Sequence, residues 1–324
     1  MTGGAAQAAS AGGTVAVAAT AAAPSGRPTM LAAAPLVLSI QSHVAFGHVG
    51  NAAAVLPLQL LGIQPVVVNT VQFSNHTGYG EFKGQVFPAS HVGEVLDGLR
   101  GRGILQRCVA VLSGYLGDAD TGEQILAAVA EIRRSQPEMC YLCDPVIGDT
   151  GRGVFVRPGI PDFLRDRAVP AATVITPNHF EFAYLHGAPV RTVDAAIAAA
   201  RAMLGTPARP GPRIIVITSF TDGVDDGALL TLGIDAVGAW AVSTPRVPLD
   251  PLPNGMGDVF SALLLGHLLQ GMAFPDALSE TVSALYALVA RTVQGDRDLP
   301  LVAAREQLVA PLERFSAVLV AHAP

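Results

Sequence analysis

The sequence predicts an α/β fold in which a mostly parallel sheet is covered by helices on both faces. Two patterns lead to this prediction: short β-rich blocks alternate with helical patterns, and the β-rich blocks are apolar almost throughout. A strand that is buried on both faces has no polar side, so continuous apolar character is typical of parallel sheets. The chain has 324 residues, of which 50% are hydrophobic and 14% charged, which is enough for one large α/β domain or two ordinary ones.

The chain contains six β-rich blocks, a later hairpin and a helical tail. The blocks lie at residues 36–41, 65–71, 108–113, 139–144, 173–176 and 213–218. Helical patterns fill most of the intervals, as at 121–135 and 193–204, and predict crossover connections. Residues 228–233 and 238–243 predict a hairpin, and the tail from Asp258 onward predicts helices that break near 271–275 and 295–300. Because no internal repeat or linker is present, we expect one domain over residues 36–324.

Residues 1–35 differ in composition from the rest of the chain. They are mostly Ala, Gly, Ser, Thr and Pro, with Arg27 as the only charged residue and no hydrophobic period. Such a segment cannot bury enough apolar surface to fold, so we expect a disordered extension. A secretory signal is the alternative, because residues 30–40 are apolar. A signal needs a basic region before this run and a cleavage site after it, but here the run continues directly into Gln41. Met30 is a candidate for the true start.

Composition and charge argue against several classes of protein. The formal net charge of -6 argues against a general nucleic-acid binder, which needs a basic face to neutralise phosphates. No apolar run reaches the roughly 18 residues that a membrane-spanning helix needs, so we expect no membrane partner. Lys83 is the only lysine, and Phe82 precedes it where a Walker A loop requires Gly, so the chain has no such loop.

The cysteines favour a reducing compartment. The chain has three of them, an odd and low number, so we expect a cytoplasmic protein. Cys140 and Cys143 form a C-x-x-C motif, which can indicate zinc or a redox pair. They fall in a predicted strand, where positions three apart face opposite sides of the sheet. We therefore interpret them as core cysteines.

Small polar and acidic side chains follow the predicted strands. Because ligands of open α/β sheets bind beyond the carboxyl ends of the strands, these side chains describe a polar crevice. Each of them alone is equally typical of a helix cap or a turn. The residues in question are Ser42, His43 and 47–51 after the first strand, Asn69, Thr70 and 75–80 after the second, Ser113 and Tyr115 after the third, Asp144 and Asp149 after the fourth, Thr176, Asn178 and Glu181 after the fifth, and Thr218 and Ser219 after the sixth.

The sharpest local motif is Asn-Gly-Met-Gly-Asp at residues 254–258, which an apolar helix follows. Two glycines allow a tight turn with exposed N–H groups, and these groups together with the positive end of the helix dipole predict an anion site. Asp258 has two interpretations at this stage. It either caps the helix or acts as a catalytic base beside the bound anion.

These motifs together resemble the pyridoxal kinases of the ribokinase-like superfamily. The resemblance covers residues 36 to about 290 in family order. The run Gln-Phe-Ser-Asn-His-Thr at 72–77 is specific to the pyridoxal branch, and the Gly-x-Gly-Asp element at 255–258 is shared across the superfamily. The matching segments are 42–44, 47–51, 71–80, 112–115, 143–146, 175–178 with Glu181, 216–219 and 255–258.

The resemblance implies ATP-dependent phosphorylation of the 5′-hydroxyl of pyridoxal, and also of pyridoxine and pyridoxamine. It implies that Asp258 accepts the hydroxyl proton and that the backbone N–H groups of Gly255, Met256, Gly257 and Asp258 form the anion hole. On the vitamer side, the resemblance assigns ring contacts to Ser42 and Thr77 and pocket walls to Val49 and Tyr115.

On the nucleotide side, the resemblance implies a set of residues around the triphosphate and its cations. This set is Asp144, Asp149, Thr176, Asn178, Glu181, Thr218 and Ser219, with Asp144, Asp149 and Glu181 near the metal. Carboxylate oxygens are ligands that Mg²⁺ prefers, directly or through water; the alternative is that these are solvated turn acids. The family uses Mg²⁺ with ATP, is often activated by a monovalent cation such as K⁺, and is usually homodimeric.

Two positions depart from the family pattern. Some bacterial relatives carry Lys where this chain has Thr218, so phosphate neutralisation here falls more on the metal. Met256 is bulkier than the usual Thr or Val, but only its backbone N–H is needed.

Three other functions remain open from the sequence. A hydroxymethylpyrimidine kinase shares the fold and the terminal Asp, but Ser42, His43 and residues 75–77 favour pyridoxal. A sugar kinase is disfavoured because the Gly-Gly signature expected after the first strand is missing. A non-catalytic pyridoxal-binding protein is disfavoured by Asp258 and its intact glycine turn.

Overall fold

A ten-stranded sheet forms the centre of the part of the chain that the computed structural model describes, namely residue 1 and residues 34–225 and 227–322. The strands, in spatial order, are β12 (Val318–His322), β11 (Gly238–Pro245), β10 (Ala228–Ile234), β9 (Ile214–Phe220), β8 (Val174–Ile175), β5 (Cys140–Cys143), β4 (Cys108–Ser113), β1 (Leu36–Val44), β2 (Gln64–Phe73) and β3 (Gly84–Val86).

The central strands from β2 to β9 pair in parallel, as predicted. The outer strands pair antiparallel: β3 on one side, and β10, β11 and β12 on the other. All parallel strands therefore present their carboxyl ends at one edge of the sheet. The polar and acidic residues that follow the predicted strands lie at this edge.

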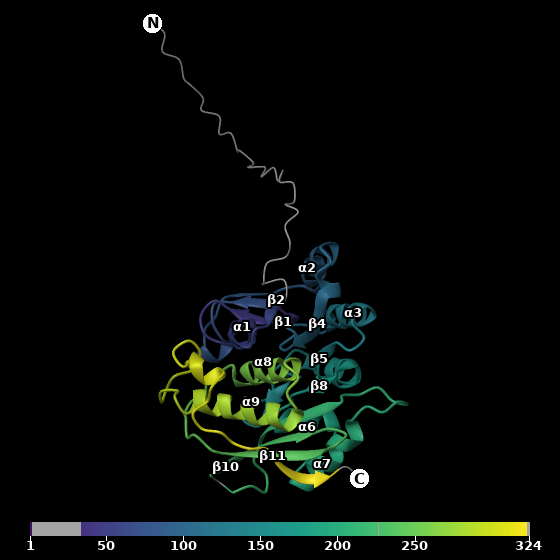
Figure 1. The fold of residues 1–324 in the computed structure, drawn as a ribbon. Helices are drawn as coiled ribbons and strands as arrows, with labels where there is room; N and C mark the ends of the chain where they lie inside the picture. The colour runs from purple at the N-terminus through teal and green to yellow at the C-terminus, as the bar shows by residue number, and fades with distance from the viewer. Residues whose placement is uncertain (2–33, 226, 323–324) are drawn as a thin grey trace. The chain divides into compact units, whose positions relative to one another are not determined.

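Helices cover both faces of the sheet (Figure 1). One face packs against α1 (Asn51–Leu60), α8 (Met256–Leu269) and α9 (Phe274–Val289). The other packs against α2 (Ala89–Gly101), α3 (Ala119–Ser135), α4 (Ile160–Phe163), α6 (His179–His186) and α7 (Val193–Met203). Shorter elements are η2 (Thr77–Tyr79), η3 (Leu105–Arg107), β6 (Gly148–Asp149), β7 (Gly153–Val154), η4 (Leu164–Ala168), α5 (Val169–Ala171) and η5 (Arg305–Leu308).

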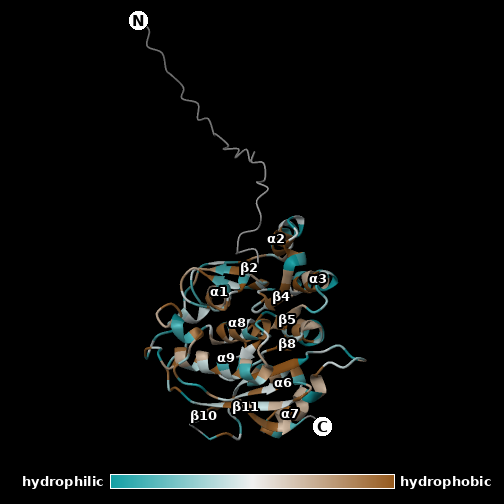
Figure 2. Cartoon of the chain, in the orientation of Figure 1, coloured by the Kyte–Doolittle hydropathy of each residue, from teal (hydrophilic) through white to brown (hydrophobic). Residues whose placement is uncertain are grey.

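The core consists of two apolar layers that the sheet separates. Alternate strand residues point into opposite layers: Leu38 and Ile40 of β1 join one, and Val37 joins the other. Helix α8 is buried from Val259 to His267, and Figure 2 shows this helix and the central strands in the hydrophobic colour. An amphipathic helix would leave one face polar, so the burial of α8 indicates that it packs between the sheet and other helices.

Cys140 and Cys143 lie on opposite faces of β5, as predicted. Cys143 belongs to one layer and Cys140 packs against the other. Both thiols are free, as is that of Cys108. Burial raises the pKa of Cys140 and Cys143 to about 12 and that of Cys108 to about 11.

Three parts of the chain differ from the sequence prediction. The prediction of a helical tail is wrong for β12, which pairs with β11 instead. The hairpin of β6 and β7 and the edge strand β3 were not predicted, because segments this short carry no readable periodicity. The extension predicted for residues 1–35 lies almost entirely outside the described residues. No helix in the described residues is both long and apolar enough to cross a membrane.

Candidate active site

The residues that follow the parallel strands meet the start of α8 at the carboxyl edge of the sheet. Helix α8 begins at Met256, within the segment that we call the glycine turn (residues 254–258). Gly255 holds the N-cap position with φ of 80°, and no side chain caps the helix. A β-carbon at Gly255 would overlap the carbonyl oxygen of His48, so only glycine fits. The first N–H groups of α8 are thus without a side-chain acceptor, which suits an anion.

Asp258 is the third residue of α8 and does not cap it. Instead, the backbone N–H of Gly50, the N-cap residue of α1, donates to its carboxylate. Burial raises the pKa of Asp258 to about 6, and the Gly50 hydrogen bond limits the rise. The carboxylate is therefore ionised at neutral pH with a pKa close to working pH, which suits a general base. The helix-cap interpretation lacks its hydrogen bond.

Asp144 follows β5 and lies close to the glycine turn. A β-carbon at Gly257 would stand 3.3 Å from its Oδ2 atom. Asp144 is almost fully buried. Burial and the negative charges of Glu181 and Asp258 raise the pKa of Asp144 well above its usual range, while a hydrogen bond with Ser261 opposes the rise.

Thr176 acts on this part of the site through Ser261. The two hydroxyls lie 2.9 Å apart in a buried contact, and Ser261 in turn bonds Asp144. The resemblance assigns Thr176 to ATP; in the structure its hydroxyl contacts Ser261, the neighbour of Asp144. Ser261 was missed, because on an apolar helix a single serine gives no signal of its own.

Asn178 and Glu181 form a capping box at the start of α6. The Asn178 Oδ1 atom accepts from the Glu181 N–H at 2.9 Å, and the Glu181 Oε2 atom accepts from the Asn178 N–H at 2.9 Å. The Glu181 Oε1 atom accepts from the N–H of Ile147 at 2.9 Å. Burial raises the pKa of Glu181 to about 7 against these hydrogen bonds. Glu181 thus holds the loop after Asp144 in place.

Asp149 has an arginine partner. It lies in the β6–β7 hairpin, and Arg152 Nε donates to its Oδ2 atom at 2.7 Å. Its Oδ1 atom accepts from the N–H groups of Gly151 and Arg152 at 3.1 and 2.8 Å. Burial alone would raise the pKa of Asp149. The hydrogen bonds and the charge of Arg152 outweigh burial, so the pKa lies below its usual range. Asp149 is therefore paired with a cationic side chain, that of Arg152.

Thr218 and Ser219 lie in β9 beside the capping box. Thr218 forms a parallel bridge with Asn178, which brings two predicted nucleotide residues together. Ser219 has φ of 56°, and it is the one non-glycine residue of the described chain with positive φ. Such backbone strain is concentrated at functional sites.

The predicted vitamer residues come from three loops. Ser42 near the end of β1 lies against Gly50, where a β-carbon would overlap its carbonyl oxygen. Asn51 fixes this corner, because its amide donates to the carbonyl oxygen of Val68 at 3.0 Å and its Oδ1 atom accepts from Ser39 at 2.7 Å. Val49 is buried.

Thr77 and Tyr115 complete the vitamer side. Thr77 is exposed and begins η2, where His76 Nδ1 accepts from the Gly78 N–H at 3.1 Å. This helix belongs to a segment that we call the acceptor loop (residues 74–83). The Thr70 hydroxyl donates to the carbonyl oxygen of Tyr115 at 2.7 Å, and burial raises the pKa of Tyr115.

The acids fit a metal ion that arrives with a nucleotide. Within residues 34–225 and 227–322, no three His, Cys, Asp or Glu side chains are close enough to hold a metal by themselves. Mg²⁺ is commonly bound by one or two carboxylates and by substrate phosphates, not by a complete protein cage. Asp144 suits this arrangement, because it is buried beside like charges that a cation would offset.

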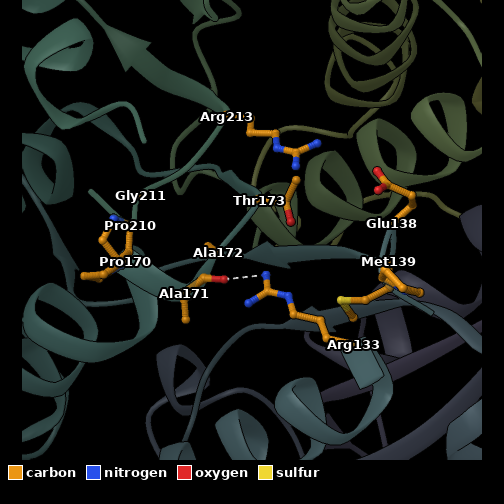
Figure 3. Close-up of a pocket in the computed structure, with 11 residues that line it drawn as sticks. Arg133, Glu138, Met139, Pro170, Ala171, Ala172, Thr173, Pro210, Gly211 and Arg213 are labelled. Carbon is orange, nitrogen blue, oxygen red and sulfur yellow. Dashed lines mark hydrogen bonds between the residues drawn. The ribbon is translucent and has the colours of Figure 1, made fainter. Parts of the chain in front are cut away.

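A separate cavity of about 260 Å³ lies at the other edge of the sheet (Figure 3). Met139, Thr173 and Arg213 line it, and these residues come directly before β5, β8 and β9. Arg133 also lines it and donates to the carbonyl oxygen of Ala171 at 2.7 Å. None of the predicted site residues borders this cavity.

Comparison with known proteins supports the interpretation of the sequence. The family described as phosphomethylpyrimidine kinase matches residues 106–300. A Rubrobacter xylanophilus protein named pyridoxal kinase PdxY is 54% identical over 86% of this chain and 95% of its own length. The Granulibacter bethesdensis protein of that name is 47% identical over 87% of this chain and 98% of its own.

Solved structures of pyridoxal kinases are similar to this chain in fold. The Leishmania donovani pyridoxal kinase in complex with ADP and ginkgotoxin has a TM-score of 0.81 at 31% identity, covering 87% of this chain and 98% of that one. The Entamoeba histolytica pyridoxal kinase has a TM-score of 0.80 at 25% identity, over 89% and 100% of the two chains. The ribokinase-like fold is confirmed by these neighbours, and the chain belongs to the pyridoxal kinase family.

Proposed function

We propose that the protein transfers the γ-phosphoryl group of ATP to the 5′-hydroxyl of pyridoxal, with Asp258 as the base and the glycine turn as the anion site. The observation that carries this assignment is that Asp258 lies at the start of α8, caps nothing and has a pKa raised to about 6. Related kinases support the substrates, since Leishmania donovani structures contain ADP with pyridoxine or pyridoxamine.

Asp258 removes the proton of the 5′-hydroxyl. As the hydroxyl oxygen forms its bond to the γ-phosphorus, the bond between that phosphorus and the bridging oxygen of ADP breaks. The proton passes to the Asp258 carboxylate, and ADP leaves with the bridging oxygen. Phosphoryl transfer depends mainly on alignment and charge stabilisation, and the chain supplies both through fixed backbone around this carboxylate.

The glycine turn stabilises the transferring group. The N–H groups at the start of α8 have no side-chain cap. Together with the positive end of the helix dipole, they stabilise the negative charge of the phosphoryl oxygens. With Lys83 as the only lysine, and Lys83 in the acceptor loop, these dipoles replace the lysine of a Walker A loop.

On the nucleotide side, Asp144 is the proposed metal ligand, and its neighbours keep it in position. Asp144 would hold Mg²⁺ with the ATP phosphates, and the ion would neutralise charge on the phosphoryl oxygens. Thr176 through Ser261, and Glu181 through the loop at 147–148, hold Asp144 and its surroundings in place. Asp149, Asn178, Thr218 and Ser219 complete the proposed nucleotide side.

The vitamer side is built from Ser42, Val49, Thr77 and Tyr115. Hydroxyl groups pair with the polar substituents of the pyridine ring, and the apolar and aromatic side chains cover its faces. Activation by K⁺ and a homodimeric assembly are proposed with this function. A KCl titration of the rate and sedimentation equilibrium test them.

The experiment that tests the function is a turnover assay of the purified protein with MgATP. Pyridoxal and hydroxymethylpyrimidine are offered separately, and formation of ADP and of the phosphorylated product is followed. Phosphorylation of pyridoxal, lost in Asp258→Asn, is the expected result. Preference for hydroxymethylpyrimidine would overturn the substrate assignment, and tight pyridoxal binding without turnover would indicate a binding protein.

A further inference from the structure

Asp298 joins three segments that the proposed function places around the vitamer. It follows α9, and its backbone pairs in a parallel bridge with Asn254, the residue before Gly255. The Asn254 N–H also donates to the carbonyl oxygen of Arg297 at 2.8 Å. Asp298 is thereby fixed beside the glycine turn.

The two carboxylate oxygens of Asp298 reach two different loops. The Oδ1 atom accepts from the N–H of His48 at 3.2 Å, one residue before Val49. The Oδ2 atom accepts from the hydroxyl of Tyr79, two residues after Thr77. Partial desolvation and this bond raise the pKa of Tyr79 to about 12, so the hydroxyl remains a donor at neutral pH. Two of the three loops that carry proposed vitamer contacts are therefore attached to one side chain.

The tip of the acceptor loop, residues 76–80, has few other anchors outside the loop. None of the loop residues from 74 to 83 is buried. Arg297 holds it by donating to the carbonyl oxygen of Gly78 at 2.8 Å, and the same guanidinium lies 5.9 Å from the ring centre of Tyr79. The Tyr79 ring also meets Phe46 edge-on at 6.4 Å. A segment that polar contacts hold, without apolar burial, opens locally at low cost.

We propose that Asp298 is a positioning residue for the vitamer, and that its hydrogen bond to Tyr79 holds the acceptor loop closed over the vitamer side of the proposed site. The proposal rests on the proposed function, which supplies the vitamer contact of Thr77. Closing the loop brings Thr77 to the ring, while Asp258 and the glycine turn do the chemistry. The bond to Tyr79 therefore contributes to vitamer affinity, and phosphoryl transfer from the filled site is independent of it.

Steady-state kinetics of Tyr79→Phe test this proposal. This variant removes the hydroxyl and keeps the ring on Phe46 and Arg297. The KM for pyridoxal is expected to rise about tenfold, with kcat within about twofold and the KM for ATP unchanged. Asp298→Ala raises the KM for pyridoxal at least as much, and adding Tyr79→Phe to it has no further effect, because the two groups share one bond. Asp276→Asn, at an exposed position of α9, is the control and stays at the wild-type values.

Hydrogen exchange measures the same bond without catalysis. The amides of residues 77–83 are expected to exchange faster in Tyr79→Phe than in the wild type. Added pyridoxal is expected to slow their exchange more in the wild type than in Tyr79→Phe. Unchanged exchange and KM, additive effects in the double variant, or a loss of kcat at constant KM would each overturn the proposal. If the wild type fails to bind or phosphorylate pyridoxal, the proposed function fails, and faster exchange in Tyr79→Phe still identifies the loop contact.

Discussion

The backbone N–H of Gly50 donates to the carboxylate of Asp258, so the residue that caps α1 holds the side chain at the start of α8. Two helix N-termini therefore converge on one carboxylate. Their dipoles favour its ionised form, and burial opposes them. The pKa of Asp258 therefore depends on the balance between burial and the main chain of Gly50.

Asp258→Asn is expected to lower kcat by at least about 100-fold while pyridoxal affinity changes less than about tenfold. The amide keeps the shape but cannot take the proton. Asp276→Asn is a matched control, because Asp276 is likewise the third residue of its helix, α9. Turnover and thermal midpoint are measured for both variants. Near-normal kcat in Asp258→Asn would contradict the catalytic assignment.

The pH profile should show the raised pKa of Asp258. With a pKa of about 6, kcat/KM for pyridoxal falls below pH 6, by about tenfold per unit. A profile that stays flat to pH 4.5 would show that no group of this pKa is needed in its ionised form.

Stability should change with pH in the opposite sense to activity. The folded pKa values of Asp258 and Glu181, about 6 and about 7, lie above the ordinary values of 3.8 and 4.5. The folded state therefore binds protons more tightly, and these two groups make the free energy of unfolding fall as pH rises from about 4 to about 7. Denaturant titrations across this window measure the slope, which is expected to be smaller in Asp258→Asn.

Gly255→Ala is expected to abolish turnover and to lower the thermal midpoint. The added methyl group would overlap the His48 carbonyl oxygen, so the glycine turn must move. Gly271→Ala is the matched control: Gly271 has the same φ of 80°, but nothing lies near its missing β-carbon. The control bears only the backbone strain, on the order of 1 kcal/mol, and keeps its activity. Equal loss in both variants would attribute the effect to strain alone.

Thr77→Ala and Ser42→Ala should mainly raise the KM for the vitamer. Ser42 lies near the carboxyl end of β1 and Thr77 lies in the acceptor loop, both on the proposed vitamer side. Ser243→Ala, an exposed serine of β11, serves as the control. A collapse of kcat with constant KM would show that the assigned role is wrong.

Glu181→Gln and Asp149→Asn should move the Mg²⁺ dependence of the rate to higher concentration. Glu181 holds the loop after Asp144, and its amide cannot accept all three backbone N–H groups, so its thermal midpoint also falls. Asp149→Asn loses its ion pair with Arg152, which is half-exposed and contributes little to stability. An unchanged Mg²⁺ titration at normal stability would identify both as ordinary structural acids.

The central sheet was predictable because its signal is local. Buried parallel strands are apolar throughout. The polar residue that follows each strand indicates where the strand ends, and these ends all lie at the carboxyl edge of the sheet. The glycine turn was predictable for a similar reason, since two glycines and an acid before an apolar helix leave few interpretations. Edge strands such as β12 carry a weaker pattern, because one side of each faces solvent.

The partners of the acids were harder to predict. The capping box of Asn178 and Glu181 was not predicted, although Asn followed by Glu three residues later is its signature. The Asp298 contacts were not visible: this residue meets His48 and Tyr79 across 250 and 219 positions of the chain. Long-range contacts of this kind leave no spacing pattern in a single sequence.

Cys108 and Cys143, both fully buried, give the protein an internal reporter of its own unfolding. Burial raises their pKa values to about 11 and about 12, and a thiol reagent reaches them only after the core opens. The rate of modification at low denaturant then measures how often the sheet separates from its helices. Ligands that bind the folded state slow that reaction in proportion to their occupancy, so an affinity can be read from cysteine modification without following catalysis.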